Sequence, residues 1–395
     1  MTRDVTLPVA SMRVSLARTR ERLAAPPALD PRGARAILGS ACDAFAEPVS
    51  PAAHTLFGPR GAAITASGAL WVADTGHHRL LGWPSLPARD GEAAQWLIGQ
   101  PHFAAEGRNG HQEVGAATLN VPTGVTACGK GLAVADAWNH RVLIWHRAPC
   151  AAHVPADVVL GQRDAHGSAI NRGRDAPDAD TLYWPYGVFW DGADLWVADT
   201  GNRRVLRFDG LPQHHGQPAI LVLGQPDFVH RDENAGGVDA RSLRWPHALA
   251  LWRGCLVVAD AGNNRLLLWP EAPQSHYAAS ERVLGQADAT AVDHNRGEYW
   301  PGRASLNMPY GLAVHHDRLL VADTANSRVL RFDDPDDTEA NALAGQDCFS
   351  DKGDNRWQPP ARDSLCWPYA LAVDGDTAIV VDSGNNRVLL WELAP

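Results

Sequence analysis

One pattern recurs six times along the chain: a hydrophobic run that ends in Asp, followed five residues later by Arg and two aliphatic residues. Successive copies of this Asp are 62, 63, 61, 63 and 59 residues apart. A period this regular means that the chain stacks one supersecondary unit, so the sequence has to be interpreted repeat by repeat. The six pairs are Asp74 and Arg79, Asp136 and Arg141, Asp199 and Arg204, Asp260 and Arg265, Asp323 and Arg328, and Asp382 and Arg387.

Each repeat is predicted to form four short strands. In the third copy the first strand follows Pro185, and the second is the Leu-Trp-Val-Ala-Asp run ending at Asp199, which is rich in β-branched and aromatic residues. A Gly-Asn turn leads into the third strand, because these residues tolerate positive φ in a tight hairpin. The Val-Leu-Gly stretch before Gln225 forms the fourth. Six repeats of four antiparallel strands, without helical periodicity, predict an all-β six-bladed β-propeller.

The two ends of the sequence are predicted to close the ring. The last repeat supplies only three strands, which finish at Trp391. Residues 36–40 match the Val-Leu-Gly-Gln strand that this repeat lacks, and pairing them with it would remove both free sheet edges. We therefore assign residues 36–395 to the propeller and residues 1–35 to an N-terminal arm that is partly disordered or a short helix.

These motifs resemble the NHL-repeat family of β-propellers. The similarity rests on the pattern Asp-x-Gly-Asn-x-Arg-Val-Leu, best preserved at residues 199–206 and 382–389, and on a Pro-x-Gly-Leu-Ala pattern that opens the blade. It extends over residues 36–395, although the period is about twenty residues longer than the usual repeat of roughly 40. The excess lies between Gln and Pro, in long connectors between blades. The resemblance implies the propeller fold, and because the family includes scaffolds, RNA binders and some lyases, it implies no single activity.

Composition narrows the class of partner. The chain has 45 acidic and 35 basic residues, and this net charge of −10 argues against nucleic acid, whose binding needs a positive surface. No apolar run is long enough to span a membrane, and residues 1–35 do not resemble an export signal. Six Cys residues without a regular framework fit a reducing interior. The sequence thus predicts a cytoplasmic protein without a membrane or nucleic-acid partner, and its high Ala and Arg content favours a bacterial source.

The repeated Asp and Arg are interpreted as structural, because a catalytic site needs unlike groups that converge at one point. The informative positions are those that differ between blades at equal phase. The residue after each Pro begins the innermost strand beside the central channel, next to a Gly or Ala where strands crowd together. This axial ring consists of Arg60, Thr123, Tyr186, His247, Tyr310 and Tyr369. A cation and several phenols suit a small polar or anionic ligand, whereas the alternative is that the aromatic side chains plug the channel.

Other side chains on the same face are candidate ligand contacts or metal ligands. Trp138 replaces the usual turn Gly of the second blade and should project beside His140 as a further contact. The axial ring has no carboxylate for Ca²⁺ and only one imidazole for zinc. The candidate metal ligands are His77, His78, His140, His247, Cys42, Cys348 and Cys366. We interpret these histidines as replacements for turn Asn and these cysteines as small buried apolar groups, so that no metal or cofactor is expected.

The sequence therefore favours a non-enzymatic propeller that serves as an interaction module, a scaffold or a ligand-binding protein through its long-connector face. Its partner would be a protein, alone or in a larger complex, with a small polar or anionic ligand as a further candidate. The alternative is a lyase or hydrolase that acts on a small polar substrate at the axial mouth.

Overall fold

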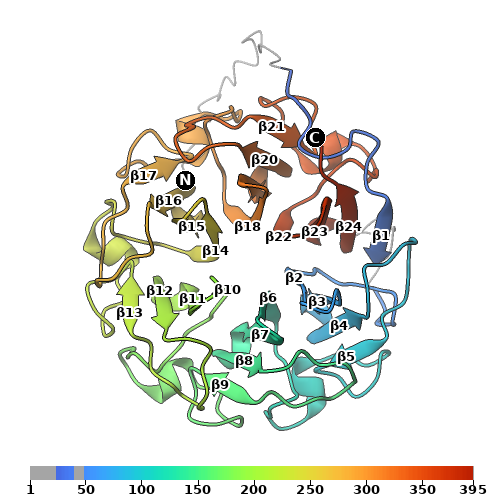
Figure 1. Cartoon of the computed structure of the whole chain (residues 1–395), viewed down its shortest axis with the longest axis vertical. Helices are drawn as coiled ribbons and strands as arrows, with labels where there is room; N and C mark the ends of the chain where they lie inside the picture. The colour runs from blue at the N-terminus through green and yellow to red at the C-terminus, as the bar shows by residue number, and fades with distance from the viewer. Residues whose placement is uncertain (1–23, 40–48, 395) are drawn as a thin grey trace, which may run out of the picture.

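The computed structural model describes residues 24–39 and 49–394, which form a ring of six blades around a central axis (Figure 1). Each blade is a four-stranded antiparallel sheet. This confirms the predicted all-β six-bladed propeller and the number of strands per blade. Cys42 lies outside the described residues.

Within each blade the strands are ordered from the axis to the outer edge as they follow in the chain. In the sixth blade the outermost strand is β1 instead. From the first blade to the sixth the strands are β2 (Gly61–Ile64), β3 (Leu70–Asp74), β4 (Arg79–Trp83) and β5 (Trp96–Ile98), then β6 (Pro122–Cys128), β7 (Gly131–Asp136), β8 (Arg141–Trp145) and β9 (Val158–Leu160), then β10 (Gly187–Trp190), β11 (Leu195–Asp199), β12 (Arg204–Phe208) and β13 (Leu221–Leu223), then β14 (Pro246–Trp252), β15 (Cys255–Asp260), β16 (Arg265–Trp269) and β17 (Arg282–Leu284), then β18 (Pro309–His315), β19 (Arg318–Asp323), β20 (Arg328–Phe332) and β21 (Ala342–Ala344), then β22 (Pro368–Asp374), β23 (Thr377–Asp382), β24 (Arg387–Glu392) and β1 (Ala36–Gly39).

Short 3₁₀ segments form two sets, one between the second and third strands of each blade and one in the connectors. The first set is η1 (Thr75–His77), η3 (Ala137–Asn139), η5 (Thr200–Asn202), η7 (Ala261–Asn263), η9 (Thr324–Asn326) and η11 (Ser383–Asn385). The second set is η2 (Arg108–His111), η4 (Ile170–Gly173), η6 (Glu233–Gly236), η8 (His294–Gly297) and η10 (Asp354–Trp357).

The hairpin turn differs from the expected one. The Gly and Asn of the motif lie inside the 3₁₀ turn, and the residue after the Asn takes the left-handed conformation, as Arg203 does with φ 56°. The residues at this position are His78, His140, Arg203, Asn264, Ser327 and Asn386. We call them the left-handed turn residues.

The hydrophobic core lies between adjacent blades, because each sheet is covered on both faces by its neighbours. Every residue of β3 and β11 is buried. Trp71 of the first blade, for example, shares a cluster with Val134 of the second. Crowding near the axis explains the Gly of the inner strands, since a Cβ on Gly61 would lie only 2.0 Å from the carbonyl oxygen of Thr123.

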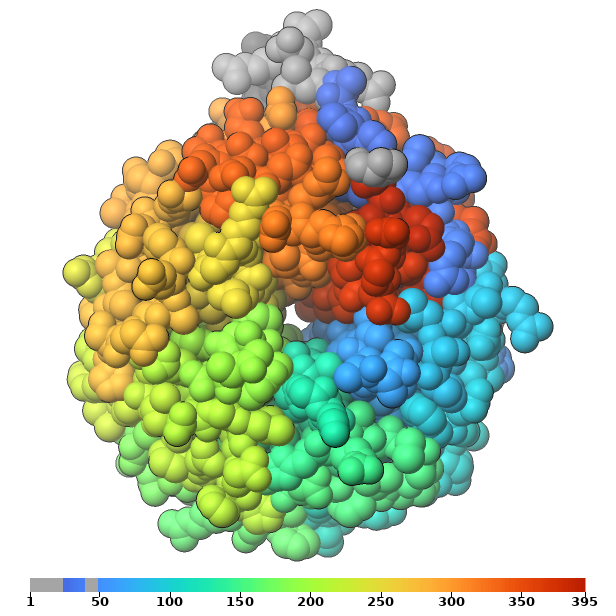
Figure 2. Space-filling view, viewed as in Figure 1, coloured from blue at the N-terminus to red at the C-terminus, as the bar shows by residue number. Residues whose placement is uncertain are grey.

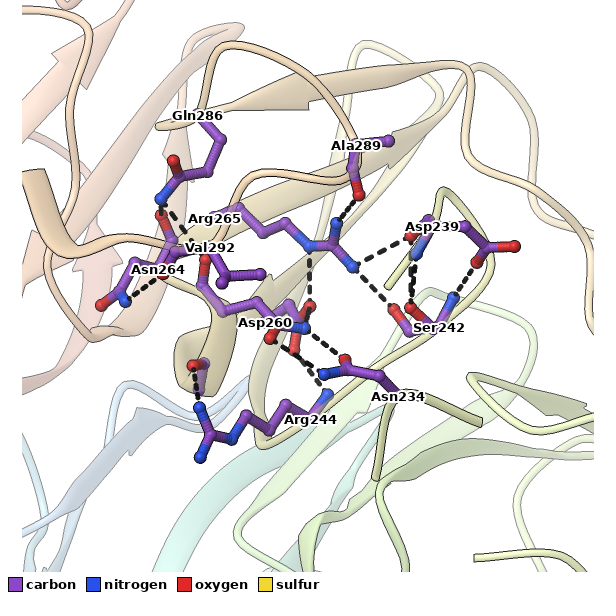
Figure 3. Close-up of polar contacts among 12 residues, drawn as sticks. Asn234, Asp239, Ser242, Arg244, Asp260, Asn264, Arg265, Gln286, Ala289 and Val292 are labelled. Carbon is purple, nitrogen blue, oxygen red and sulfur yellow. Dashed lines mark hydrogen bonds and ion pairs between the residues drawn. The ribbon is translucent and has the colours of Figure 1, made fainter. Parts of the chain in front are cut away.

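The repeated Asp and Arg clamp the connectors onto the blades (Figure 3). In the fourth blade, Asp260 accepts hydrogen bonds from Nε of Arg265 at 2.8 Å and from the backbone N–H of Arg244 at 2.9 Å. The guanidinium of Arg265 then donates to backbone carbonyls of the connectors that enter and leave the blade, at Asp239, Ser242 and Ala289. Both charged groups are fully buried, and the guanidinium donates four hydrogen bonds. These contacts support the structural interpretation of the repeated pair.

The ends of the chain meet in the sixth blade, where β1 pairs antiparallel with β24, with Ala36 opposite Leu390 (Figure 1). The closing strand is therefore where the sequence predicts it. Residues 24–35, which the sequence assigns to the arm, pack on the propeller. The backbone N–H of Ala28 donates to the carbonyl of Leu343 in β21, and Nε1 of Trp391 donates to the carbonyl of Asp30. Residues 1–23 lie outside the described residues.

Candidate functional site

Five of the six axial-ring residues form a closed circuit at one mouth of the channel. Nη1 of Arg60 donates to the hydroxyl of Tyr186 at 2.8 Å, and its guanidinium lies 4.8 Å from the ring centroid of Tyr369. Successive ring centroids from Tyr369 through Tyr310 and His247 to Tyr186 are 4.7, 4.1 and 4.7 Å apart. Equal phase in the repeat has thus placed these side chains at one height on the axis.

Thr123 is the axial-ring residue that does not join this circuit. Its side chain is buried, and its hydroxyl donates to the backbone carbonyl of Tyr186 in the next blade at 2.9 Å. A β-branched side chain of this length reaches the neighbouring backbone rather than the axis. The expected ligand contact of Thr123 is therefore not supported by the geometry.

The five residues of this circuit line the mouth of an axial cavity of about 380 Å³. Beneath it the walls consist mainly of small and aliphatic side chains of the six inner strands, with Phe189 as an aromatic member, and Arg60 is the one charged residue in the lining. Figure 2 shows that the centre of the ring stays open, so the aromatic side chains do not seal it as a plug would. A cavity with apolar walls and a few convergent polar groups at its mouth is typical of a small-ligand site.

The electrostatics of the mouth favour an anion. None of the ion pairs among the described residues involves Arg60, and its contacts are to phenol and aromatic groups. Burial, together with the charge of Arg60, lowers the pKa of His247 to about 4, although the bond to the Trp245 carbonyl opposes this shift. Since Nδ1 of His247 donates to that carbonyl, Nε2 is left as an acceptor. Burial also raises the pKa of Tyr310 and Tyr369, so both phenols stay protonated and can donate.

A broader hollow of about 730 Å³ lies outside the mouth on the same face. It shares Arg60, Tyr186 and Tyr369 with the axial cavity and adds large apolar side chains from several blades. Exposed aromatic residues of this hollow are Phe57, Trp138, Trp184 and Trp367. Trp138 lies 6.5 Å from Trp184, measured between ring centroids, so the predicted contact residue does reach this surface.

The residue before each inner-strand Pro forms a rim around the mouth. These rim residues are Gly58, Val121, Trp184, Trp245, Met308 and Trp367. All except Trp245 have positive φ, which is unfavourable for bulky or β-branched side chains and needs external support. The support comes from the preceding blade, where a side-chain acceptor of the left-handed turn residue binds the rim N–H. Asn264, for example, accepts from Met308 at 2.9 Å.

This relation gives His78 and His140 a role that the sequence did not suggest. Nδ1 of His78 accepts from the N–H of Val121 at 3.0 Å, and Nδ1 of His140 accepts from that of Trp184 at 3.2 Å. Burial lowers the pKa of both, that of His140 to about 4, and so keeps them neutral as acceptors. Arg203, which has no side-chain acceptor, precedes the one rim residue without positive φ. A polar residue directly after the turn Asn was the available signal in the sequence.

The remaining metal candidates are also explained by structural contacts. His77 takes the place of the turn Asn, and its two ring nitrogens lie 2.8 Å from Asp74 Oδ2 and from the carbonyl of Val49. Cys348 and Cys366 are buried, and burial raises the pKa of the Cys366 thiol. In the described part of the chain, none of these residues belongs to a group of three His, Cys, Asp or Glu whose ligand atoms lie within 4.8 Å of one another.

Comparison with known proteins agrees with this architecture. A family model described as NHL repeat matches residues 58–83. NHL repeat-containing protein 2 of Homo sapiens is 24% identical over 360 residues, which cover 82% of this chain and 45% of that protein. The Gallus gallus protein of the same name is 23% identical, with 82% of this chain and 45% of that protein covered. The chain thus spans about half the length of the curated relatives it matches.

Among solved structures, a structural genomics protein of unknown function from Bacteroides thetaiotaomicron aligns with a TM-score of 0.54 and 13% identity, covering 90% of this chain and 74% of that one. At this identity the match establishes the fold alone. The resemblance of the sequence to the NHL-repeat propellers is confirmed.

Proposed function

We propose that this chain, a six-bladed NHL-repeat β-propeller, is a non-enzymatic interaction module that binds a segment of a partner protein across its long-connector face. The segment would place a carboxylate on Arg60 at the mouth and lay apolar side chains in the surrounding aromatic hollow. NHL-repeat propellers commonly mediate protein interaction.

The observation that carries the proposal is the environment of Arg60. Its guanidinium has no carboxylate partner among the described residues and is held by Tyr186 and Tyr369 at the base of the hollow. A cation fixed in this way is prepared for a charge-assisted hydrogen bond to an anionic group. Because the site is shared by the axial cavity and the outer hollow, one ligand can use both.

The exposed aromatic side chains support a protein partner rather than a free anion. Trp184 and Trp367 are each more than a third exposed, and both belong to the hollow that contains Arg60. Large apolar side chains grouped on a surface mark interaction sites, and Trp with Arg is typical of the residues that dominate binding energy. A small anion would contact only the mouth.

Catalysis at the mouth is a second candidate that the geometry supports less. Its general base would have to be His247, the one imidazole in the lining of the axial cavity. A base whose pKa is lowered to about 4 accepts a proton weakly near neutral pH. The lining also lacks a carboxylate to assist it. We therefore place binding ahead of a lyase or hydrolase activity.

Cellular context stays a prediction. No helix of the described residues is long and apolar enough to cross a membrane. The cytoplasmic location and the bacterial source expected from composition are proposals, and the curated relatives named above are animal proteins.

A peptide-array experiment tests the proposal. Immobilised peptides that combine one carboxylate with Leu, Phe or Pro neighbours would be probed with the wild-type chain, with Arg60→Ala and with Arg89→Ala, an exposed arginine matched as a control. We expect a set of peptides that binds the wild type and the control but not Arg60→Ala. Equal binding by Arg60→Ala would refute the assignment. If free succinate binds in an Arg60-dependent manner while no peptide does, the ligand is a small anion.

A further inference from the structure

The ends of the inner strands opposite the Arg60 mouth carry a second cluster of polar side chains. Tyr310 stands near the start of β18, whereas His315 ends this strand about 17 Å further along at the usual rise per residue. His316 follows in the tight turn between β18 and β19. Asp376 occupies the corresponding turn between β22 and β23 in the next blade. Hairpins of the fifth and sixth blades thus meet at this end of the channel.

The three side chains converge on one point. Nε2 of His315 lies 3.4 Å from Oδ1 of Asp376, and Nε2 of His316 lies 3.9 Å from the same oxygen. One ligand atom from each residue lies within 4.8 Å of the others, the one such group in the described part of the chain. Ligand atoms bound tetrahedrally at about 2.0–2.1 Å from Zn²⁺ are separated by roughly 3.4 Å. The observed spacing is therefore close to that of a zinc site.

The contact between His315 and Asp376 is not an ordinary hydrogen bond. Although the two atoms are 3.4 Å apart, the angles at Nε2 of His315 do not give a hydrogen bond of good geometry, so its interaction with Asp376 is mainly electrostatic. The imidazole is mostly buried, with 15% of its side chain exposed, whereas His316 and Asp376 are open to solvent. A buried nitrogen 3.4 Å from a carboxylate oxygen, without a well-formed hydrogen bond between them, suits two ligands that share a cation.

The backbone holds this arrangement firmly. His316 and Asp317 both have positive φ, 42° and 63°, in the turn. The carbonyl of Asp317 accepts hydrogen bonds from Nε1 of Trp252 at 2.7 Å and from Nε of Arg253 at 3.2 Å. The turn that carries His316 is thus anchored on the fourth blade, so binding a metal would require little ordering.

We propose that His315, His316 and Asp376 form a Zn²⁺ site with three protein ligands and a fourth position open to solvent. Two imidazoles and a carboxylate match the ligand preference of this ion, and an accessible fourth position is typical of sites that retain water. The bound ion would link the hairpin of the fifth blade to that of the sixth, the blade in which the ends of the chain pair. The site is independent of the Arg60 mouth, since it lies at the other end of the inner strands.

Zinc titration of the full chain after removal of metals with EDTA tests this site. Isothermal calorimetry should show one equivalent of bound Zn²⁺, and Co²⁺ in its place should give the visible absorption of a site with nitrogen and oxygen ligands. His316→Ala and Asp376→Asn should each weaken binding by more than the about 10–100-fold that loss of an outer partner costs. His230→Ala is the matched control, because His230 is exposed and contacts a single carboxylate, Asp227, at 2.7 Å.

Zinc should also raise the unfolding temperature of the wild type and of His230→Ala, but not that of the two site variants. Circular dichroism would verify that all variants are folded. The proposal would be overturned if the wild type bound no equivalent of Zn²⁺, or if Asp376→Asn and His316→Ala bound it with the affinity of the wild type. A comparable loss in His230→Ala would show that binding is distributed over surface histidines, which would also overturn it.

Discussion

Nδ1 of His140 accepts a hydrogen bond from the backbone N–H of Trp184 at 3.2 Å, and so a turn of the second blade holds a rim residue of the third. Trp184 needs this support because its φ of 57° is costly for a bulky side chain. Val121 stands in the same relation to His78. Two histidines that suggested metal binding are therefore acceptors between blades.

Two substitutions of His140 should distinguish the contribution of its hydrogen bond to stability from that of imidazole packing. We expect His140→Ala to lower the free energy of unfolding by about 0.5–1.5 kcal/mol, the net value of one such bond. His140→Asn should lose less, since Asn264 makes the same contact with Met308. Urea denaturation measures both. Equal losses in the two variants would mean that the ring packs rather than accepts.

Acid should destabilise the fold through the same residue. Burial lowers the pKa of His140 from its ordinary 6.5 to about 4, so the unfolded chain binds this proton in a pH range where the folded chain does not. Its contribution to stability is therefore full above pH of about 6.5 and lost as the pH falls toward about 4. Over this window His140→Asn should lose less stability than the wild type. Identical pH profiles from urea denaturation would contradict the neutral-acceptor role.

The buried Asp of the repeat should matter for stability and not for binding. Asp199 accepts hydrogen bonds from Arg204, from Asn202 and from the backbone of Tyr183, all at 2.7–2.8 Å. Asp199→Ala leaves the Arg204 charge buried and unpaired, and should cost about 3–5 kcal/mol. The exposed control Asp175→Ala should stay within about 0.5 kcal/mol. Loss of ligand binding in a normally stable Asp199→Ala protein would refute the structural role.

At the axial mouth, substitutions should affect ligand binding and not stability. Arg60→Ala should weaken binding of an anionic ligand by about 1.5–3 kcal/mol, and Tyr310→Phe by about 0.5–1.5 kcal/mol, because the first removes a charged donor and the second a neutral one. Unfolding temperatures should barely change, since neither residue belongs to the repeated clamp. If both variants unfold easily while affinity is constant, the axial ring is structural and binding lies on the connectors.

Truncation should show that the segment before β1 contributes to the fold. Removal of residues 1–34 deletes Ala28 and Leu29 and with them their contacts to the fifth and sixth blades. The unfolding temperature of this truncated chain should therefore be lower than that of a chain lacking only residues 1–23. Removal of residues 1–39 also deletes β1 and should lower it further and promote association through the free edge of β24. Equal stability and solubility of the three proteins would contradict the observed closure.

The fold was predictable because the same pattern of strands recurs in six repeats. The equal position of the axial residues within each repeat also correctly placed five of them together. Phase could not show that the short side chain of Thr123 would bond to Tyr186 instead of facing the axis. It also could not show bonds between blades, which depend on left-handed backbone at both His140 and Trp184.

The cluster at the other end of the channel did leave a signal that was missed. His315 and Asp374 both follow the inner-strand Pro of their repeat by six residues, so the tight turns after them are equivalent. Comparing those turns would have placed His316 and Asp376 in neighbouring blades. Their side-chain distances still required the structure, because turn geometry decides where the two groups point.

The pairing of β1 with β24 also imposes a delay between the synthesis of the two strands and their pairing. Ala36 leaves the ribosome long before Leu390, its partner in the sheet. At translation rates of about 5–20 residues per second, this strand waits roughly 20–70 s for its partner. During that interval its backbone groups have no neighbouring strand to bond with, so nascent chains are open to mispairing with one another. Slow translation or a shortage of chaperones should therefore reduce the yield of this protein through mispairing of β1.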